Sequence, residues 1–347
     1  MSNIDFVLVW VDNTSRSWNE QRRAAWKELH PGEHDAEEEK DNGACRYREM
    51  GTLRYWFRSV EKFASWVNKV YFVTCGQQPS WLNIHHPKLV RVNHEDYIPS
   101  KYLPTFNSNP IELNLHRIPE LSENFVLFND DVFLLRPVSP EFFFINDEPV
   151  LPCDLSICDY FGYNNWSFSC FNDYCVLNDS FNLYESIWNN RHKWFNVKEL
   201  GIRTAVKNFL CYKLNRTLSL RGYEHLANAQ LKSTIRQIWE KWPDILDGTS
   251  CQRFRSSTQV NQWLACAWNQ ASGKFYPARP YSHGSHFNVS TAQLDYICSI
   301  IENQSIPQIC VNDSADNDDP DRCFLALKEA FEAILPDRSS FESEGED

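Results

Sequence analysis

Short apolar runs alternate with helical patterns in the first half of the chain. Four runs rich in β-branched and aromatic residues predict buried strands at 4–11, 70–74, 89–92 and 125–128, and each ends in polar residues. Apolar residues at steps of three and four predict amphipathic helices between the first two strands, at 17–29 and 48–67. The acidic stretch 33–42 between these helices predicts a surface loop.

This alternation predicts the fold class. Strand, helix and strand in succession are typical of an α/β protein with a Rossmann-like, doubly wound and mostly parallel sheet. Such sheets bind ligands beyond the carboxyl ends of their strands. The polar residues that follow each predicted strand are therefore the first place to look for a site.

After about residue 150 the chain changes to aromatic-rich helical segments. Helical stripes of apolar residues begin near Leu231 and Val260. His225 comes shortly before the first stripe and Arg255 shortly before the second. A late strand at 309–311 is expected to rejoin the sheet, and a last helical stripe ends at Ile334. We therefore expect four parts: a Rossmann-like nucleotide-sugar-binding half (1–150), a helical part that completes the site (151–313), a C-terminal helix (314–336) and a disordered acidic tail (337–347).

The distribution of charge along the chain limits the classes of molecule that the protein could bind. The net charge is −12, but three acidic stretches, 33–42, 313–321 and 337–347, together carry −14, so the rest of the chain is about +2. Nucleic-acid binding needs a broad basic face and is disfavoured. No apolar run approaches the roughly 18 residues of a membrane helix, and the amino terminus has no signal-like core. We therefore expect a cytoplasmic protein without a transmembrane segment.

Twelve cysteines without any CxxC pair are typical of reduced, mostly buried thiols. Cys153, Cys158, Cys170 and Cys175 repeat a five-residue step that could hold a four-thiolate metal site. Structural zinc sites use tighter ligand spacings, so zinc is the less favoured interpretation.

The sequence Asn129-Asp130-Asp131 at a strand end is the sharpest local feature. Adjacent carboxylates on an extended strand point to opposite faces, so both can serve one site only if the chain turns there. A divalent cation or an acid/base site for a phosphate-bearing substrate would use such oxygens. A turn capped by Asn and Asp would have the same sequence.

Three further sets have both a functional and an ordinary interpretation. Glu112 and His116 are four residues apart and would share a helical face, next to Arg117, as a site or as an exposed ion pair. Arg54 and Arg58 could neutralise a diphosphate or form a solvated helix face. His225 and Arg255 could be catalytic, or His225 could only cap a helix.

Thirteen motifs, in chain order, resemble the Stealth family, which contains bacterial capsular-polysaccharide phosphotransferases and the catalytic subunit of the lysosomal-enzyme N-acetylglucosamine-1-phosphotransferase. Together these motifs span residues 4 to about 313. They are 5–12 (DFVLVWVD), 53–55 (LRY), 58–66 (RSVEKFASW), 73–77 (VTCGQ), 103–106 (LPTF), 111–112 (IE), 116–118 (HRI), 128–132 (FNDDV), His225, 231–234 (LKST), 239–242 (WEKW), 254–256 (FRS) and 309–313 (ICVND).

The resemblance implies a glycosyltransferase-A-like fold and the transfer of an N-acetylhexosamine 1-phosphate, expected to be N-acetylglucosamine 1-phosphate, from a UDP-sugar to a sugar hydroxyl. UMP would leave and a phosphodiester would form in a capsular or cell-surface polysaccharide. The resemblance also implies Mg²⁺ or Mn²⁺ as cofactor and an oligo- or polysaccharide as acceptor. Peripheral contact with capsule assembly or export machinery at the inner membrane is compatible with this expectation.

The resemblance also assigns residues. Family active-site positions match Glu112, Asp131, His225 and Arg255. The expected donor-binding residues are Trp10, Asp12, Arg54, Gly76, His116 and Arg117, and the expected metal ligands are Asp130, Asp131, Asn312 and Asp313. We expect Arg255 to face the phosphoryl oxygens and His225 to act as base toward the acceptor.

Two other functions remain open from the sequence. A metal-dependent glycosyltransferase would use the same sheet and the same kind of acidic strand end, but would release UDP. A non-catalytic carbohydrate-binding subunit is suggested by the 13 Trp and 14 Tyr, although most of these lie on helical stripes typical of a core.

Overall fold

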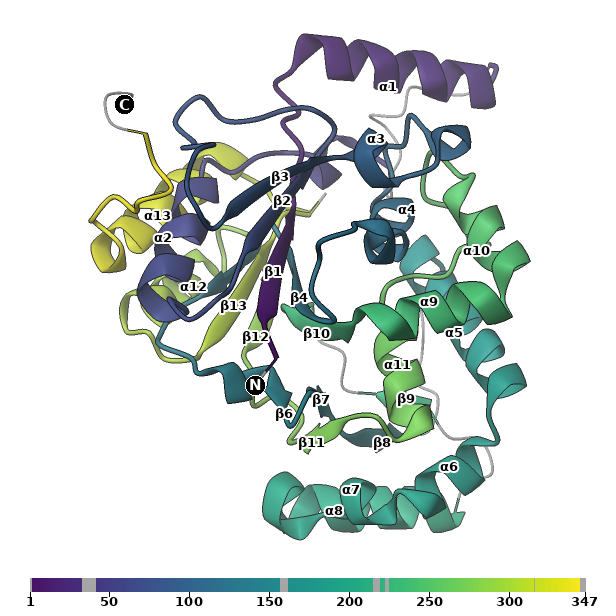
Figure 1. The fold of residues 1–347 in the computed structure, drawn as a ribbon. Coiled ribbons are helices and arrows are strands. Elements are labelled where there is room, and N and C mark those ends of the chain that lie inside the picture. Colours follow the sequence, from purple (N-terminus) through teal and green to yellow (C-terminus); the bar gives the residue numbers. More distant parts are fainter. Residues whose placement is uncertain are drawn as a thin grey trace.

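The fold is built on a five-stranded sheet with strand order β10-β4-β1-β2-β3 (Figure 1). The computed structural model describes residues 2–32, 42–156, 162–214, 219–221, 225–314 and 316–343. The strands β1 (Ile4–Val9), β2 (Val70–Thr74), β3 (Leu89–Asn93) and β4 (Asn124–Asn129) are parallel, and β10 (Asn228–Leu231) pairs antiparallel with β4. The predicted Rossmann-like α/β class is confirmed.

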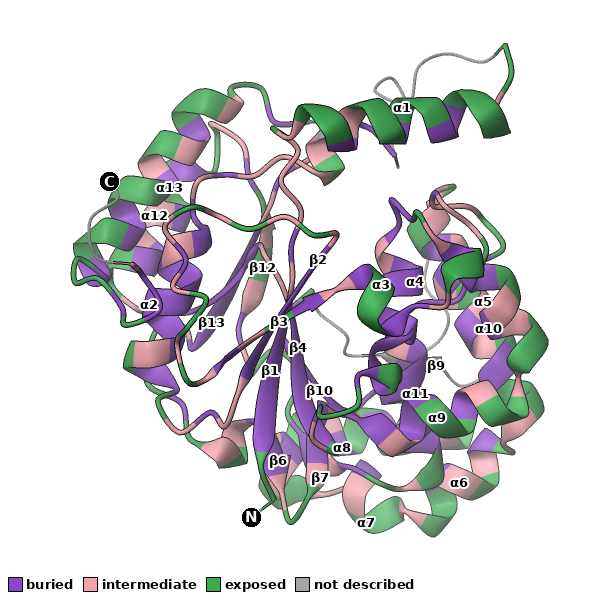
Figure 2. Cartoon of the chain, turned by 45° about the horizontal axis from the view of Figure 1, so that its top comes forward, coloured by how far each residue is buried: buried purple, intermediate pink, exposed green. Residues whose placement is uncertain are grey.

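Both faces of this sheet are buried. Phe6 and Leu8 of β1 point into a core shared with α2 (Leu53–Phe63), α12 (Leu294–Glu302) and α13 (Pro320–Ile334). Val7, between them, points into the core on the other face, which includes α9 (Lys232–Lys241) and α11 (Trp263–Ser272). Alternating side chains of an extended strand point to opposite faces, which explains the unbroken apolar runs. Figure 2 shows these central strands as buried and the outer helix faces as exposed.

Three small sheets surround the central one. The first contains β12 (Ser285–Asn288), β13 (Gln308–Asn312) and β5 (Val132–Leu134), the second β11 (Tyr276–Ala278), β7 (Glu148–Pro152) and β6 (Phe144–Ile145), and the third β8 (Asp154–Ser156) and β9 (Ser219–Arg221). The expectation that the strand at 309–311 rejoins the central sheet is therefore wrong. It pairs with β5 instead, because the chain turns away from β4 after Asn129.

The remaining helices lie around these sheets and differ in part from the predicted bounds. They are α1 (Arg16–Leu29), α3 (His94–Tyr97), α4 (Ser108–Leu113), α5 (Asn165–Ser180), α6 (Leu183–Asn189), α7 (Arg191–Trp194), α8 (Val197–Leu214) and α10 (Pro243–Ser250). The helix predicted at 17–29 is confirmed as α1. The amphipathic helix expected within 48–67 is confirmed as α2, and Arg48 to Thr52 precede it. No helix in the described parts of the chain has the length and apolarity to cross a bilayer.

The chain does not divide cleanly at residue 150. The stretch 151–313 is mostly helical, as expected, yet its strand β10 hydrogen-bonds to β4 of the first half. The strand β13, from the same stretch, pairs with β5. The two halves therefore share their sheets, and a site at the sheet edge draws residues from both.

The C-terminal segment is tied to the fold by a buried ion pair. Nε of Arg58 donates to Oε1 of Glu342 at 2.9 Å and Nη2 donates to Oε2 at 3.1 Å, while the two side chains are 6% and 3% exposed. Phe341 packs on Phe57. Ser339, Phe341 and Glu342 are therefore buried, which corrects the predicted disordered tail for this part of it; residues 344–347 lie outside the described part. Arg58 is neither a phosphate ligand nor part of a solvated face.

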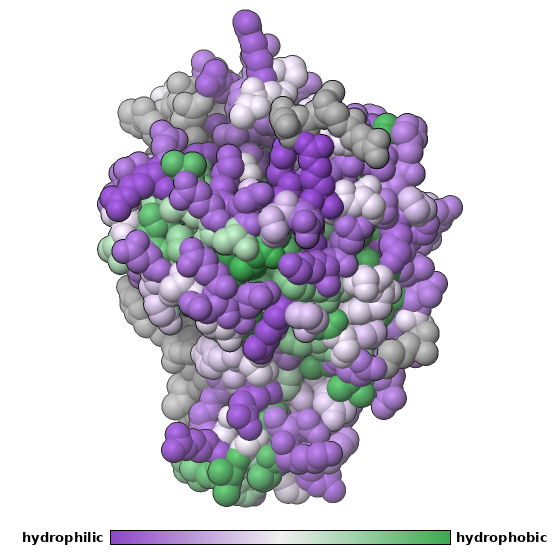
Figure 3. All heavy atoms as spheres, turned by 90° about the vertical axis from the view of Figure 1, so that its left-hand side faces the viewer, coloured by the Kyte–Doolittle hydropathy of each residue, from purple (hydrophilic) through white to green (hydrophobic). Residues whose placement is uncertain are grey.

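The surface over this side of the molecule is mostly hydrophilic (Figure 3). Hydrophobic side chains gather there in a central band and at the lower end. The lower end in this view corresponds to the end of Figure 1 where α7 and α8 lie.

Replacing Glu342 by Gln should lower the free energy of unfolding by about 1.5–3 kcal/mol, because the buried Arg58 would lose its charged bidentate partner and keep Glu332, 3.0 Å from its Nη1, as its remaining carboxylate. Urea denaturation followed by circular dichroism measures this loss. Burial raises the pKa of Glu342, but hydrogen bonds from Arg58 and Ser339 outweigh it and lower the pKa overall. The pair's contribution is therefore complete at neutral pH and is lost as the pH falls below the ordinary carboxylate range.

Glu20→Gln is the matched control. Its ion pair with Arg16 joins side chains that are 62% and 92% exposed, so the loss should stay below about 0.5 kcal/mol. Equal effects of the two substitutions would contradict the role given to the buried pair.

Candidate active site

A polar cleft opens beyond the carboxyl ends of β4 and β13. Its empty volume is about 1780 Å³, part of which is open to solvent. Residues distant in sequence line it together: Arg46, Arg48, Ser108, Glu112, Asn129, Asp130, Asp131, Trp166, His225, Arg255, Gln259, Gln262, Trp263, His286, Asn288, Asn312 and Asp313. All four residues expected to be catalytic lie in this one cleft.

Asp130 and Asp131 form the link between β4 and β5. The strand β4 ends at Asn129 and β5 begins at Val132, so the chain turns at the two carboxylates. The carbonyl oxygen of Asp131 accepts a hydrogen bond from the backbone N–H of Val311 at 2.9 Å. The condition for both carboxylates to serve one site, a turn at this point, is therefore met.

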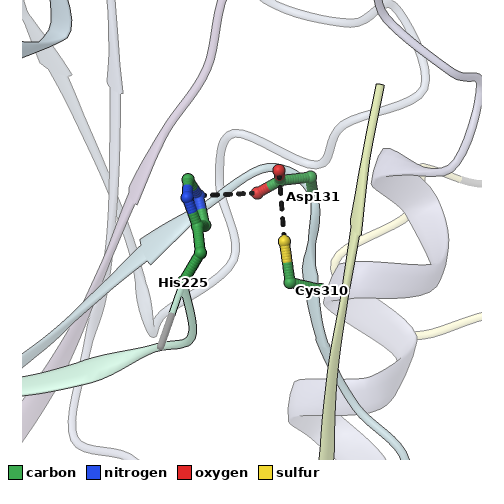
Figure 4. A group of neighbouring side chains, drawn as sticks. All are labelled: Asp131, His225 and Cys310. Carbon is green, nitrogen blue, oxygen red and sulfur yellow. Dashed lines mark hydrogen bonds and ion pairs between the residues drawn. The ribbon is translucent and has the colours of Figure 1, made fainter. Parts of the chain in front are cut away.

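Asp131 is the centre of a buried cluster with His225 and Cys310 (Figure 4). Its Oδ1 lies 3.6 Å from Nε2 of His225, and its Oδ2 lies 3.3 Å from Sγ of Cys310. Burial and the charge of Asp131 raise the pKa of the Cys310 thiol, which therefore stays protonated and donates. His225, whose side chain is 45% exposed, forms the open side of the cluster.

The charges of this cluster stabilise one another. Burial alone would lower the pKa of His225, but the attraction of Asp131 and Glu112 outweighs it and raises that pKa. Burial alone would raise the pKa of Asp131, whereas the charge and hydrogen bond of His225 lower it overall. Both groups therefore favour their charged forms, and the pair can hold or release a proton next to the cleft.

Glu112 is a buried carboxylate in the same cleft. It sits on α4, is 4% exposed, and accepts a hydrogen bond from Nδ2 of Asn129 at 3.4 Å. Burial raises its pKa to about 7, against the opposing charges of Arg255 and His225. A carboxyl that titrates near neutral pH can give or take a proton during a reaction.

Arg255 is held by the loop between α10 and α11. Its Nη2 donates to Oγ of Ser108 at 3.2 Å, and its backbone N–H donates to Oδ1 of Asn42 at 2.9 Å. Nδ2 of Asn107 donates to the carbonyl oxygens of Gln252 and Phe254, both at 3.1 Å. The loop that follows LPTF therefore fixes the guanidinium at the cleft.

The oxygen-rich strand ends fit a hard divalent cation. Burial raises the pKa of Asp130 to about 8, with Asp131 and Glu49 adding like charge. A cation would relieve that repulsion, and carboxylate and amide oxygens are the donors that Mg²⁺ and Mn²⁺ take. Asp130, Asp131 and Asn312 are the candidates. The fourth expected ligand, Asp313, accepts from Nδ2 of Asn317 through Oδ1 and pairs with Arg48 through Oδ2, both at 2.9 Å, so its role as a ligand stays a prediction.

Gly76 lines a second cavity rather than the cleft. This cavity, near the ends of β2 and β3, is lined by Trp18, Gln21, Cys75, Gly76, Asn93, His94, Glu95, Leu103, Pro104, Thr105 and Phe106. The ring of Trp18 meets that of Tyr47, a residue of the cleft, with centroids 5.2 Å apart. The two hollows therefore adjoin at this pair of rings.

The other expected donor-binding residues line neither hollow. Trp10 packs in the core with its ring 5.5 Å from that of Phe72. Asp12 caps its own turn by accepting from Thr14 at 2.8 Å. Arg54 lies on α2 over the ring of Trp81.

His116 and Arg117 lie against Trp239, away from the cleft. The helix α4 ends at Leu113, and the turn Leu115–Arg117 follows as a 3-10 helix. The expected helical face shared by Glu112 and His116 therefore does not form, and both residues are buried rather than exposed.

The zinc hypothesis is not supported by the described thiols. Cys158 lies outside the described residues. Within the described residues, the cluster of three His, Cys, Asp or Glu ligand atoms within 4.8 Å of one another is Asp131, His225 and Cys310, which contains a single thiol.

Several residues of the cleft and of the Asp131 cluster were not predicted. Cys310 and His286 reach the site because β12, β13 and β5 pair, with Cys310 opposite His286 and Val132. Trp166 and Trp263 supply aromatic walls from α5 and α11. The sequence signal for Cys310 was present, since it directly precedes Val311 and Asn312 in a predicted strand, but only strand pairing places it beside Asp131.

Comparisons with known proteins show which proteins the chain is similar to. Residues 46–150 match the family described as Stealth protein CR2, conserved region 2. The receptor polysaccharide phosphotransferase WefC of Streptococcus oralis is 38% identical over 99% of this chain and 100% of its own length. WefC of Streptococcus gordonii is 39% identical, over 99% of both chains. The capsular polysaccharide phosphotransferase WcwK of Streptococcus pneumoniae is 37% identical over 99% of this chain and 100% of its own.

Among solved structures, mouse xyloside xylosyltransferase 1 in its apo form aligns with 90% of this chain and 97% of its own. The identity is 11% and the TM-score is 0.35, which is too low for a structural argument.

Asp131→Asn should lower the pKa of His225, because the substitution removes its main attractive charge while keeping the side chain's shape. An NMR titration of the His225 ring in the presence of EDTA measures the shift. Glu112 and Arg255 remain, so the residual pKa reflects their opposing charges. His283, whose pKa is lowered by burial, serves as the internal control and should not move. An unchanged His225 pKa would contradict the ion pair.

Proposed function

The chain belongs to the Stealth family, and on that premise we propose that it is a polysaccharide phosphotransferase that moves a sugar 1-phosphate from a UDP-sugar to a sugar hydroxyl. The transferred group is expected to be an N-acetylhexosamine 1-phosphate, and N-acetylglucosamine is the expected sugar. The product would be a phosphodiester in a capsular or cell-surface polysaccharide. The observation that carries the proposal is the meeting of Glu112, Asp131, His225 and Arg255 from four separate segments in one cleft.

The proposed step is a displacement at phosphorus. The acceptor hydroxyl oxygen attacks the phosphorus that carries the sugar and forms the new P–O bond. The bond from that phosphorus to the oxygen bridging to UMP breaks, and UMP leaves with the electron pair. The hydroxyl proton passes to a base of the enzyme.

His225 is the proposed base. Its open side faces the cleft, and Asp131 behind it stabilises the imidazolium that forms when the proton is taken up. Because the pKa of His225 is raised, it is a stronger base when neutral, and its neutral fraction grows with pH. Glu112, with a pKa of about 7, can share the proton transfer or return a proton to the leaving side.

Arginines supply the positive charge that a diphosphate needs. Arg255 points to Ser108 in the cleft, and Arg46 and Arg48 line the same space. Guanidinium groups make paired hydrogen bonds to phosphate oxygens and can stabilise charge that grows in the transition state. A bound Mg²⁺ or Mn²⁺, held by Asp130, Asp131 and Asn312, would add further charge neutralisation at the phosphoryl oxygens.

A metal-dependent glycosyltransferase is the second candidate. The same carboxylates and arginines could stabilise a departing UDP, so the cleft alone does not distinguish the two reactions. The Stealth relatives, named as phosphotransferases over nearly the whole chain, favour the first. A purely carbohydrate-binding role would leave the near-neutral pKa of Glu112 and the Asp131–His225 pair without use.

The released nucleotide decides between the candidates. The purified protein is incubated with UDP-N-acetylglucosamine, Mg²⁺ and capsule-type oligosaccharides, and the nucleotide is identified by chromatography. We expect UMP together with a phosphodiester signal in the phosphorus-31 spectrum. UDP without a diester would assign the chain to the glycosyltransferases.

His225→Ala should lower the rate of UMP release by about 10²–10⁴-fold, because the base is lost. His283→Ala, a histidine outside the cleft lining, is the matched control and should keep most of the activity. Undiminished turnover of His225→Ala would refute the role of His225 as base.

The second cavity suits the neutral base of the donor. His94 and Thr105 are among the residues that line it. Burial lowers the pKa of His94 to about 4, so the ring is neutral. None of the described residues lining the cavity is Lys or Arg. The base would thus lie against Trp18 and Phe106, while the diphosphate lies beside the arginines of the cleft.

A further inference from the structure

Helix α8 carries an apolar surface that no other described part of the chain covers. Of its exposed large hydrophobic side chains, Ile202 is 67% and Leu214 is 78% exposed. The full set on this helix is Val197, Ile202, Val206, Phe209, Leu210 and Leu214. We call these six residues the α8 surface. We propose that it is a docking surface for an anionic lipid bilayer.

The apolar residues of the α8 surface form one stripe. The φ of Gly201 is +76°, which breaks the helix, and regular helix follows from Ile202. From there the exposed apolar residues recur at steps of four, three, one and four, which keeps them within about 140° of the helix circumference. Contiguous exposed apolar patches on a soluble protein mark interaction sites.

The opposite side of α8 is anchored to the fold. Asn208 is fully buried, and its Nδ2 donates to the carbonyl oxygens of Cys153 and Trp194, both at 3.1 Å. Its Oδ1 accepts from the N–H of Leu155 at 3.0 Å. The stripe is therefore displayed by a fixed helix, and the apolar residues cannot turn inward.

The charge around the stripe is strongly positive. Residues 191–214 contain six Lys or Arg and one Glu, a net charge of +5 in a chain whose net charge is −12. Lys193, Lys198 and Lys207 pair with Glu148, Glu199 and Asp154, so six basic residues less three pairs leave a charge of +3. Arg203 and Lys213 are exposed on the side of the helix that bears the stripe. Lys213 also lies 5.7 Å over the ring of Trp188, which is itself 44% exposed.

An apolar stripe with interspersed Lys and Arg and a nearby Trp has the chemistry of an interfacial helix. Such a helix lies in the plane of the bilayer surface, with its apolar residues among the acyl chains and its cations at anionic headgroups. A second copy of the chain fits less well, because two such surfaces face to face would bring like charges together. The α8 surface contains none of the residues that line the cleft.

The position of α8 agrees with a docking role. It lies at one end of the molecule, far from α1 at the other end (Figure 1). An end of the molecule can rest on a flat surface without obstruction from the rest of the fold.

The experiment is flotation of the full chain with vesicles of phosphatidylcholine alone or with one-third phosphatidylglycerol. We expect binding to the anionic vesicles, a partition coefficient at least tenfold lower on the neutral ones, and release at 0.5 M NaCl. Absence of binding to the anionic vesicles, or equal binding to both kinds, would overturn the proposal.

Two variants test the surface itself. The triple substitution Ile202→Ser, Phe209→Ser and Leu214→Ser should lower partitioning at least tenfold, as should the pair Arg203→Glu and Lys213→Glu. Their controls carry the same changes elsewhere: Ile84→Ser, Tyr296→Ser and Leu325→Ser, and Arg16→Glu with Lys27→Glu. Circular dichroism confirms that all variants fold. An equal loss in the controls would overturn the assignment to α8.

The oligomeric state shows whether a second copy of the chain, instead of a bilayer, occupies the α8 surface. Light scattering of the free protein should give a mass that the serine triple variant does not change. A dimer dispersed only by that variant would overturn the lipid proposal and assign the surface to a second copy.

Discussion

The turn between β4 and β5 is the constraint on which the site depends. Its second residue, Asp131, connects three segments: its carbonyl oxygen accepts from Val311, and its carboxylate contacts Cys310 and His225. Because β4 is buried between β1 and β10, the turn cannot move without disturbing the central sheet. A carboxylate held in this way can orient a histidine at an otherwise open cleft.

The second feature that determines the chemistry of the site is the burial of acidic side chains in it. Glu112 and Asp130 have pKa values of about 7 and 8, because burial penalises their charged forms and, for Asp130, like charges lie close by. A fold selected for stability alone would avoid this arrangement. The fold instead holds these groups near the point of proton exchange at neutral pH, and the rigid sheet beneath them resists relaxation.

Stabilising contacts lie at a distance from the cleft. The Arg58–Glu342 pair joins α2 to the C-terminal segment, and Asn208 anchors α8 through three hydrogen bonds to the backbone. Buried polar groups of this kind are costly unless all partners are present, so they position the segments that carry them. The cleft thus lies apart from these stabilising contacts and from the exposed α8 surface.

The sequence by itself determined the α/β class, the parallel strands, the helix α1 and the family whose motifs identify the four cleft residues. Local periodicity reports which face of an element is buried, and chain order is enough to indicate a doubly wound sheet. Only the tertiary structure decided that Arg58 binds Glu342, that His116 turns to Trp239, and that β13 pairs with β5 and brings Cys310 to Asp131. These outcomes depend on contacts between segments up to 284 residues apart, and no local pattern encodes the free energy of such contacts.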